Sequence, residues 1–337
     1  MLPLASSFEF IQAKTHGMRS RVYELERLDE LCDLRTIAQL WHRLYPEANP
    51  GDHRELQRRL LADHVHALEA VRRHMPASLL ALYTWMVRRL QVENLKVLLR
   101  AWKVHEPPQN VLPFLAPVAK DLQLNAGAFL KADGLADFIP LIPDAALRSA
   151  AERGAAHYAD TGQTFFVEAA LDTAYYTGLL GRQSELPEPH QSGTEVLVRG
   201  EIALYDILTL FRLKLNYGLR YEQATRFLVP GARHAVELDR LFAFPDFGDM
   251  VGFLPRDLLP IGDSPAVLTV ADLERALWQR LLQVANRQFY QCVADLGSAV
   301  AFYTIKRVEL ANLFHVIEGV RYEMGPGAIR QTLIRAR

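Results

Sequence analysis

Apolar residues recur at helical spacing along most of the chain. Within residues 92–103 they stand at i, i+3, i+4 and i+7, which places them on one stripe of an α-helix: Leu95, Leu98, Leu99 and Trp102. Similar stripes follow at 206–211 and 312–320. Prolines, which break helix interiors, are absent from 144–186 and 266–325. These patterns predict an all-α fold.

Three segments add detail to this prediction. We expect residues 195–215 to form one long, mostly buried helix, because their early alternation gives way to helical spacing. The sequence TVAD at 269–272 resembles a capping box and predicts a helix start. Residues 181–194, GRQSELPEPHQSGT, have the composition of a linker.

Several of these patterns recur at a fixed displacement. Asn94 and Asp206 are 112 residues apart, and so are Arg100 and Arg212. Beyond Pro255 the displacement becomes 106, which aligns Asp206 with Asn312. Two pairs of segments obey the same two displacements: 137–143 with 249–255, and 168–172 with 274–278. Independent patterns that share one spacing indicate repeated supersecondary units.

The repeat predicts the domain organisation. We expect three tandem helical units at 1–91, 92–200 and 201–307, followed at 308–337 by a closing helix that is a fourth copy of the first helix of the repeat. Each unit would hold a long helix, a short helix ending in proline and a third helix rich in Ala and Tyr. A fainter copy lies at 36–46 and 66–74.

Composition excludes some classes of protein. Lys and Arg together number 38 and Asp and Glu 39, so the chain lacks the positive surplus that nucleic-acid binding exploits. No apolar run approaches the roughly 20 residues that cross a bilayer. The amino terminus shows no export signal, which predicts a cytoplasmic protein. We therefore expect Cys32 and Cys292 to be reduced thiols in helices, and their spacing does not fit a structural zinc site.

Four segments together carry a resemblance to a known family: EFIQAKTHGMRSRVY (9–23), VENLKVLLRAWK (92–103), EAALDTAYYTGLL (168–180) and the closing stretch 305–334. In these segments the chain resembles the C subunit of the V/A-type rotary ATPases, whose family includes the d (AC39) subunit of the vacuolar enzyme. Their order spans nearly the whole chain. Glu318 departs from the pattern, since the first two units have Arg100 and Arg212 at that position.

The resemblance implies a non-catalytic coupling subunit of the central stalk. It implies three similar helical bundles around a pseudo-threefold axis in a funnel shape. One end would contact the membrane proteolipid ring on its cytoplasmic face, and the other would be a socket for the D and F subunits of the rotor shaft. Proton or sodium transport would belong to the complex. No nucleic acid, small-molecule substrate or cofactor is implied.

Searches for reactive chemistry agree with a non-enzymatic role. The chain has no phosphate-binding loop, G-x-S-x-G or H-E-x-x-H motif. The tripeptide DFG at Asp246 stands without the other kinase motifs. A group of possible metal ligands stands in one segment: Asp63, His64, His66, Glu69 and His74. Helical geometry separates His64 from His66 by about 200°, so a solvated polar face explains this group better than a metal site.

Five basic residues on the repeated long helices are candidate partner contacts: Arg100, Lys103, Arg212, Lys214 and Arg321. Their simplest role is to solvate one helix face and to complement the helix dipole. Alternatively, they point to a central axis and bind an acidic part of the shaft. His16, His105 and His315 are weaker candidates for the same role.

Two other functions remain open from the sequence. A free-standing helical-repeat adaptor would stack its units in an open superhelix, although units of this length exceed those of common helical arrays. A helical metal-dependent enzyme would use the histidine-rich segment 63–74.

Overall fold

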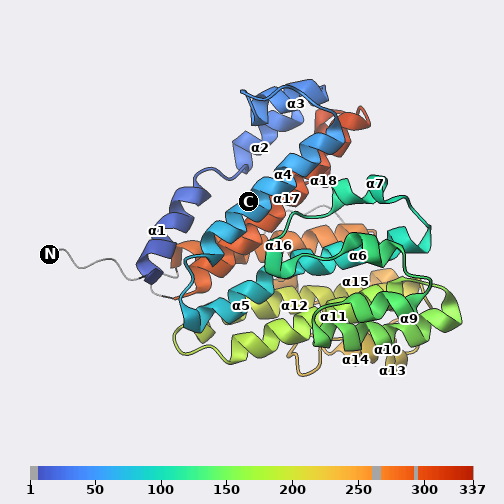
Figure 1. Cartoon of the computed structure of the whole chain (residues 1–337). Helices are drawn as coiled ribbons and strands as arrows, with labels where there is room; N and C mark the ends of the chain where they lie inside the picture. The colour runs from blue at the N-terminus through green and yellow to red at the C-terminus, as the bar shows by residue number, and fades with distance from the viewer. Residues whose placement is uncertain (1–6, 260–266, 292–294, 337) are drawn as a thin grey trace.

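The computed structural model describes residues 7–259, 267–291 and 295–336. In these ranges all regular structure is helical and no strand occurs, as the sequence predicts. The α-helices (Figure 1) are α1 (Ser7–Arg19), α2 (Leu25–Cys32), α3 (Ile37–Leu44), α4 (His53–Arg72), α5 (Ala77–Val87), α6 (Arg89–Lys103), α7 (Pro108–Val111), α8 (Ala126–Leu130), α9 (Leu135–Phe138), α10 (Ala145–Thr161), α11 (Phe165–Ser184), α12 (His190–Leu215), α13 (Tyr221–Ala224), α14 (Leu238–Ala243), α15 (Phe247–Phe253), α16 (Val270–Gln291), α17 (Gly297–Arg321) and α18 (Pro326–Thr332). Short 3₁₀ helices lie at Leu112–Phe114, Lys120–Leu122, Ile139–Leu141, Thr225–Phe227 and Arg256–Leu258.

The predicted long helix is confirmed as α12, which buries most of its apolar residues. Helices α5 and α6 together span 77–103, with a break at Arg88, and they precede α12 by the displacement of 112 residues. Helix α17 follows α12 at the displacement of about 106. The repeat in the sequence thus corresponds to three long helical segments.

Helices α15 and α16 both begin with a side-chain cap. Thr269 and Asp272 exchange hydrogen bonds, with each side chain accepting from the backbone N–H of the other at 3.1 Å, so the capping box before α16 is confirmed. Asp246 of the DFG tripeptide is the N-cap of α15, where its carboxylate accepts from the backbone N–H of Asp249 at 2.9 Å.

The linker predicted at 181–194 is confirmed only for its central part. Helix α11 continues to Ser184 and α12 begins at His190, so only 185–189 connect them. Polar composition misled here because these residues are held by the neighbouring helix end: the Gln183 amide donates to the backbone carbonyl of Gln191 at 2.9 Å. Polar residues with such partners are compatible with helix.

The predicted closing helix at 308–337 corresponds to the end of one helix, α17, and to a second helix, α18. Helix α17 begins well before it, at Gly297, and ends at Arg321, where Glu323 adopts a positive φ of 55°. Met324 N–H donates to Gly319 C=O at 2.8 Å and Glu323 N–H to Val320 C=O at 3.1 Å, which is the Schellman closure of a helix. The expected unit boundaries at 91/92, 200/201 and 307/308 fall inside α6, α12 and α17.

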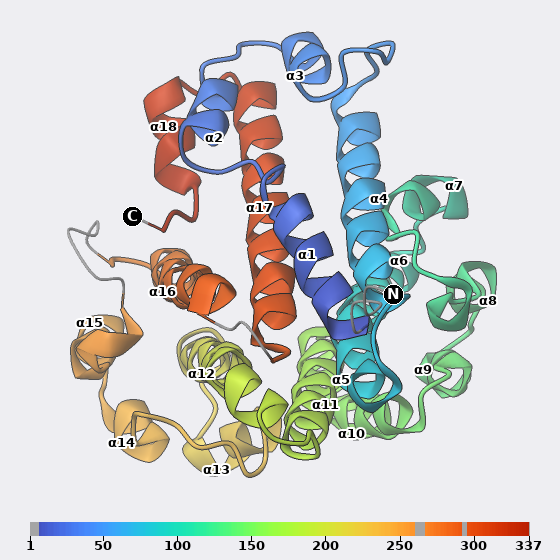
Figure 2. The ribbon, with the colours of Figure 1, turned by 90° about the vertical axis from the view of Figure 1, so that its left-hand side faces the viewer.

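The long helices form a closed circuit of contacts. Helix α5 contacts α11, which contacts α12; α12 contacts α16, α16 contacts α17, α17 contacts α4, and α4 returns to α5. Figures 1 and 2 show α4 and α17 lying side by side although they are more than 200 residues apart in the sequence.

A separate hydrophobic cluster joins the two ends of the chain. It combines buried residues of α2, α3 and α4 with those of α17 and α18, including Leu31, Trp41, Leu56, Val316 and Ile329. The C-terminal helices therefore complete the core of the N-terminal segment.

Candidate functional site

Asn94 and Asn312 make the same pair of hydrogen bonds. The amide of Asn94 donates to the carbonyl of Ala116 at 3.0 Å and accepts from its N–H at 2.7 Å. Asn312 does the same with Ile334, with both distances 2.8 Å. In each case the partner lies 22 residues further along the chain and the bonds are buried. Each asparagine therefore fixes the returning segment against its long helix.

Asp206, the equivalent residue of α12, achieves this differently. Its Oδ1 accepts from the N–H of Val229 at 3.0 Å. A carboxylate cannot donate a hydrogen bond as an amide does. The second oxygen of Asp206 lies 3.0 Å from Nε2 of His234. Burial raises the pKa of Asp206, and the hydrogen bonds from His234 and Val229 oppose that shift only in part.

The repeated helices are also paired by equivalent polar contacts. Nε of Arg100 on α6 donates to Glu168 on α11 at 2.9 Å. Arg212 on α12 donates to Glu274 on α16 at 2.6 Å. Arg100 and Arg212 differ by 112 positions and their two glutamates by 106, as the repeat requires.

The partner of Glu318 on α17 explains why this position lacks the arginine found at 100 and 212. Its helix pairs with α4, where the facing residue is Gln57, and the Gln57 amide donates to Glu318 at 2.7 Å. Arg321 lies one turn further and donates to the same carboxylate at 3.0 Å. The reversed charge at position 318 therefore accompanies a partner that is neutral.

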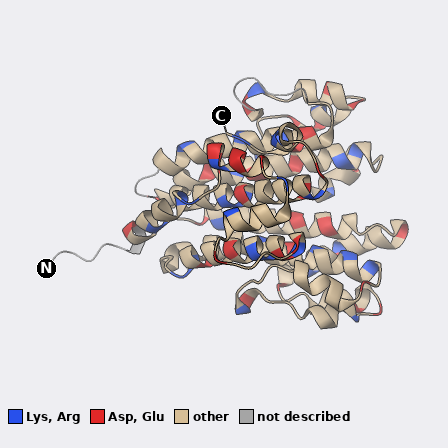
Figure 3. Ribbon diagram, turned by 90° about the horizontal axis from the view of Figure 1, so that it is seen from above, with Lys and Arg blue, Asp and Glu red and all other residues tan. Residues whose placement is uncertain are grey.

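The remaining two candidate residues have partners within the chain as well. Nζ of Lys103 donates to the Tyr158 hydroxyl at 2.8 Å. Lys214 donates to the backbone carbonyls of Phe242 and Phe244. The five predicted contact residues thus lie toward the C-terminal ends of α6, α12 and α17, and each has an intramolecular partner. In Figure 3 acidic and basic residues are mixed over the visible ribbon.

A group of charged residues between the long helices was not predicted from the sequence. Arg89 donates to Asp172 at 2.8 Å, and Lys96 lies 3.2 Å from the same carboxylate. Arg307 pairs with Glu201, which also accepts from the Tyr176 hydroxyl at 3.2 Å. The repeat could have revealed them, because residues 89, 201 and 307 are separated by 112 and 106 positions.

Three positive and three negative side chains balance one another in this central charge cluster, which allows most of it to be buried. Its members are Arg89, Lys96, Arg307, Glu93, Asp172 and Glu201. Burial alone would lower the pKa of Arg89, but Asp172 and Glu93 outweigh burial and hold that pKa well above its ordinary value. Burial would raise the pKa of Glu93, but Arg89 and Lys96 bring it down to about 2. Arg89 and Glu93 are therefore charged across the physiological range. The ion pairs of the cluster join α6 to α11 and α12 to α17.

The histidine-rich segment does not assemble into a metal site among the described residues. Asp63 accepts from the Tyr45 hydroxyl at 2.7 Å, and Glu69 pairs with Arg72 at 2.9 Å. Burial, with Lys306 and Arg307 nearby, lowers the pKa of His64 to about 3. The ring of His74 packs against Phe10.

The other predicted histidines and cysteines have separate environments. His16 packs on the rings of Phe289 and Tyr290. His105 has a φ of 55° and ends α6. Cys32 is a buried free thiol in α2, as predicted, whereas Cys292 lies outside the described residues.

Comparison with known proteins gives the family. The model of the ATP synthase (C/AC39) subunit family matches residues 11–332. The chain belongs to the C/AC39 family. Two similar relatives are the C subunits of the A-type ATP synthases of Methanosphaera stadtmanae, 20% identical over 91% of this chain and 82% of the relative, and of Methanothermobacter thermautotrophicus, 21% identical over 97% and 87%.

The C/AC39 match covers all of the equivalent contacts described above except those of Ile334 at the C-terminal edge. None of the described helices of this C/AC39 chain has both the length and the apolar character needed to span a bilayer.

Proposed function

We propose that this chain is the non-catalytic central-stalk coupling subunit of a rotary V/A-type ATPase, linking the D and F subunits of the rotor shaft to the membrane proteolipid ring during proton or sodium transport. Family membership over residues 11–332 carries this proposal. The two relatives bear the name of an A-type ATP synthase subunit, and the chain aligns with most of their length. The protein would lie on the cytoplasmic face of the membrane as a peripheral part of that complex.

The helical circuit suits this role physically. A part that transmits torque needs stiffness and broad contact surfaces rather than a reactive group, and densely packed helices supply stiffness. The ion pairs of the central charge cluster connect helices that are 83 and 106 residues apart in the sequence. The buried hydrogen bonds of Asn94 and Asn312 hold the segment that follows each long helix against it. A closed circuit of contacts also favours a compact hub over an open-superhelix adaptor.

We also propose, from the contacts between the long helices, that the chain forms three blocks around an axis. The blocks would be centred on α6 with α11, α12 with α16, and α17 with α4. The last block would join the two ends of the chain, so that the units predicted at 1–91 and 308–337 become one.

We place the shaft contact at the C-terminal ends of α6, α12 and α17. The side chains of Arg100, Arg212 and Arg321 keep 61%, 38% and 39% of their surface exposed while they are paired. A carboxylate of the shaft could therefore bind these arginines without breaking their ion pairs within the chain. The pairs of Arg212 and Arg321 are partly exposed on both sides and contribute at most about 1 kcal/mol each to stability. Glu168, the partner of Arg100, is largely buried.

Arg100→Glu tests this contact. It places two carboxylates together and removes the positive charge, so we expect the affinity for purified D–F shaft to fall at least roughly tenfold, the loss of one charge-assisted contact. Binding would be measured at fixed salt by calorimetry, with thermal unfolding as the check on folding.

The swap Arg100→Glu with Glu168→Arg is the matched control. It restores the intramolecular ion pair but moves the positive charge from α6 to α11. If the swap regains full stability and still binds the shaft weakly, Arg100 contacts the shaft. Wild-type affinity in both variants would exclude Arg100 from the interface, and failure of the unmodified chain to bind shaft or proteolipid ring would contradict the coupling function.

A further inference from the structure

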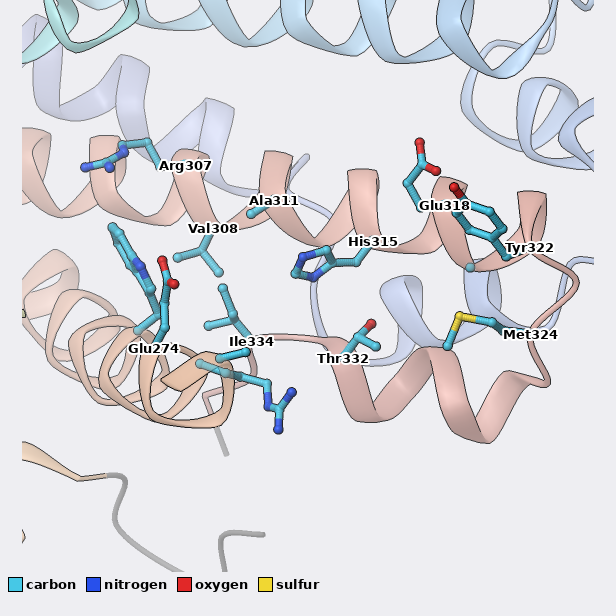
Figure 4. Close-up of a pocket in the computed structure, with 14 residues that line it drawn as sticks. Glu274, Arg307, Val308, Ala311, His315, Glu318, Tyr322, Met324, Thr332 and Ile334 are labelled. Atoms are coloured by element: carbon cyan, nitrogen blue, oxygen red, sulfur yellow. The ribbon is translucent and has the colours of Figure 1, made fainter. Parts of the chain in front are cut away.

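A pocket of about 560 Å³ lies between α16, α17 and α18 (Figure 4). This volume falls in the range of small-ligand sites, roughly 300–1,000 Å³. Apolar and polar side chains share the lining, which includes Trp278, Val308, Ala311, His315, Met324 and Ile334.

The equivalent groove between α11 and α12 is filled by two aromatic side chains of the chain itself. Tyr205 stacks on Tyr176 with ring centroids 4.6 Å apart, and its hydroxyl donates to the carbonyls of Ala169 and Phe227 at 3.0 and 3.1 Å. Phe165 stacks on Tyr217 with centroids 4.4 Å apart.

The pocket exists because both aromatic residues are replaced. At the displacement of 106, Tyr205 corresponds to Ala311 and Phe165 to Ala271, and both alanines line the pocket. Thr209, one helical turn after Tyr205, corresponds to His315. The pocket therefore has a polar side chain at position 315 but no aromatic ring at the two positions that Tyr205 and Phe165 occupy in the other groove.

The charged groups of the lining already have partners within the chain. Glu274 pairs with Arg212, Arg275 with Asp272, Arg307 with Glu201 and Glu318 with Arg321. A charged ligand would have to break one of these pairs. His315 is uncharged near pH 7, because burial lowers its pKa more than a bond to the backbone of Thr332 raises it, and a neutral imidazole can donate or accept. A neutral ligand with one hydroxyl suits this lining.

We propose that the pocket binds a neutral phenol ring, which lies between α16 and α17 in the position that Tyr205 occupies between α11 and α12, with its hydroxyl bonded to His315. The source is either a tyrosine side chain of a partner polypeptide or a small phenolic molecule. The proposal rests on this pocket and its internal counterpart, and it holds independently of the coupling function.

Titration of the full chain with p-cresol tests the proposal. The indole N–H signal of Trp278, assigned by Trp278→Phe, should shift saturably in nitrogen NMR while that of Trp85, which lies outside the pocket, stays constant. Toluene lacks the hydroxyl and should bind roughly three- to tenfold more weakly, the value of one hydrogen bond. The absence of a saturable Trp278 shift with p-cresol would overturn the proposal.

Variants that rebuild the aromatic residues supply the controls. Ala311→Tyr and Ala271→Phe should each abolish p-cresol binding, and either one suffices if the other fails to fold. Val196→Tyr adds a ring at an exposed position outside the lining and should leave binding unchanged. Unchanged p-cresol affinity in the folded Ala311→Tyr or Ala271→Phe variant would refute the site.

N-acetyltyrosinamide distinguishes the two sources. If it binds as p-cresol does, a tyrosine within a polypeptide can enter, whereas binding of p-cresol alone identifies a small phenolic ligand.

Discussion

At the scale of single residues, one structural requirement is met by two chemistries. Asn94 and Asn312 each satisfy both backbone groups of one residue, because an amide can donate and accept. Asp206 can only accept while it is ionised, so it bonds the Val229 N–H and not the carbonyl, and its second oxygen lies 3.0 Å from Nε2 of His234. The repeat in the sequence marked these three positions, but their partners 22 or 23 residues away became visible only in the fold.

Substitution of these residues should affect stability unequally. Asn94→Ala leaves the buried N–H of Ala116 unpaired, while the Ala116 C=O keeps its bond from the Val118 N–H, and it should lower the free energy of unfolding by about 1–3 kcal/mol. Asp206→Asn supplies the amide found in the other two units. It should change the free energy of unfolding by less than about 1 kcal/mol near pH 3. Urea unfolding at constant m-value measures both.

The pH dependence of Asp206→Asn has a defined sign. Because the folded protein holds the pKa of Asp206 above its ordinary value, the protonated form favours folding and this contribution is lost as pH rises through that raised pKa. Asparagine does not titrate. The stability of Asp206→Asn relative to the wild type should therefore be higher at pH 7 than at pH 3, and an opposite trend would contradict the raised pKa.

At the scale of helices, the repeated segments share their endings. His105 after α6 and Glu323 after α17 both have a φ of 55°, and Gly218 after α12 has a φ of 60°. A left-handed residue lets the following N–H groups return to the last turn, but it costs a non-glycine residue about 1 kcal/mol or more. Helical periodicity predicted the helices and not these ends, because nothing in His or Glu marks a positive φ.

Glycine at these ends should stabilise the protein. Glu323→Gly and His105→Gly are each expected to raise the free energy of unfolding by about 0.5–1 kcal/mol, since glycine adopts this conformation without a steric penalty. Gly218→Ala is the matched control and should lower it by about 1 kcal/mol. Destabilisation by both glycine substitutions would mean that the side chains at 105 and 323 matter more than the backbone.

At the scale of the whole molecule, the end of the chain completes its beginning. Cys32 is fully buried in the same hydrophobic cluster as Val316 and Ile317 of α17. Segments that share a core open together, so the N-terminal helices α2–α4 depend on residues nearly 300 positions away.

Thiol labelling tests this dependence. In a Cys292→Ser background, Ile317→Ala should cost about 2–5 kcal/mol through the cavity it creates and should accelerate labelling of Cys32 by at least roughly tenfold. Leu98→Ala makes a similar cavity in the other hydrophobic cluster and serves as control. Equal labelling rates for the two variants would contradict a local core shared by the two ends.

The sequence by itself determined the helical class, the family and the spacing of the repeat, because helical periodicity and a fixed displacement are properties of order along one chain. It also marked Arg100 and Arg212 as equivalent. Only the tertiary structure decided that Glu168 and Glu274 face them, that Gln57 faces Glu318, and that α17 joins α4. Such pairings depend on how helices distant in sequence pack together, and periodicity within one helix carries no information about its neighbour.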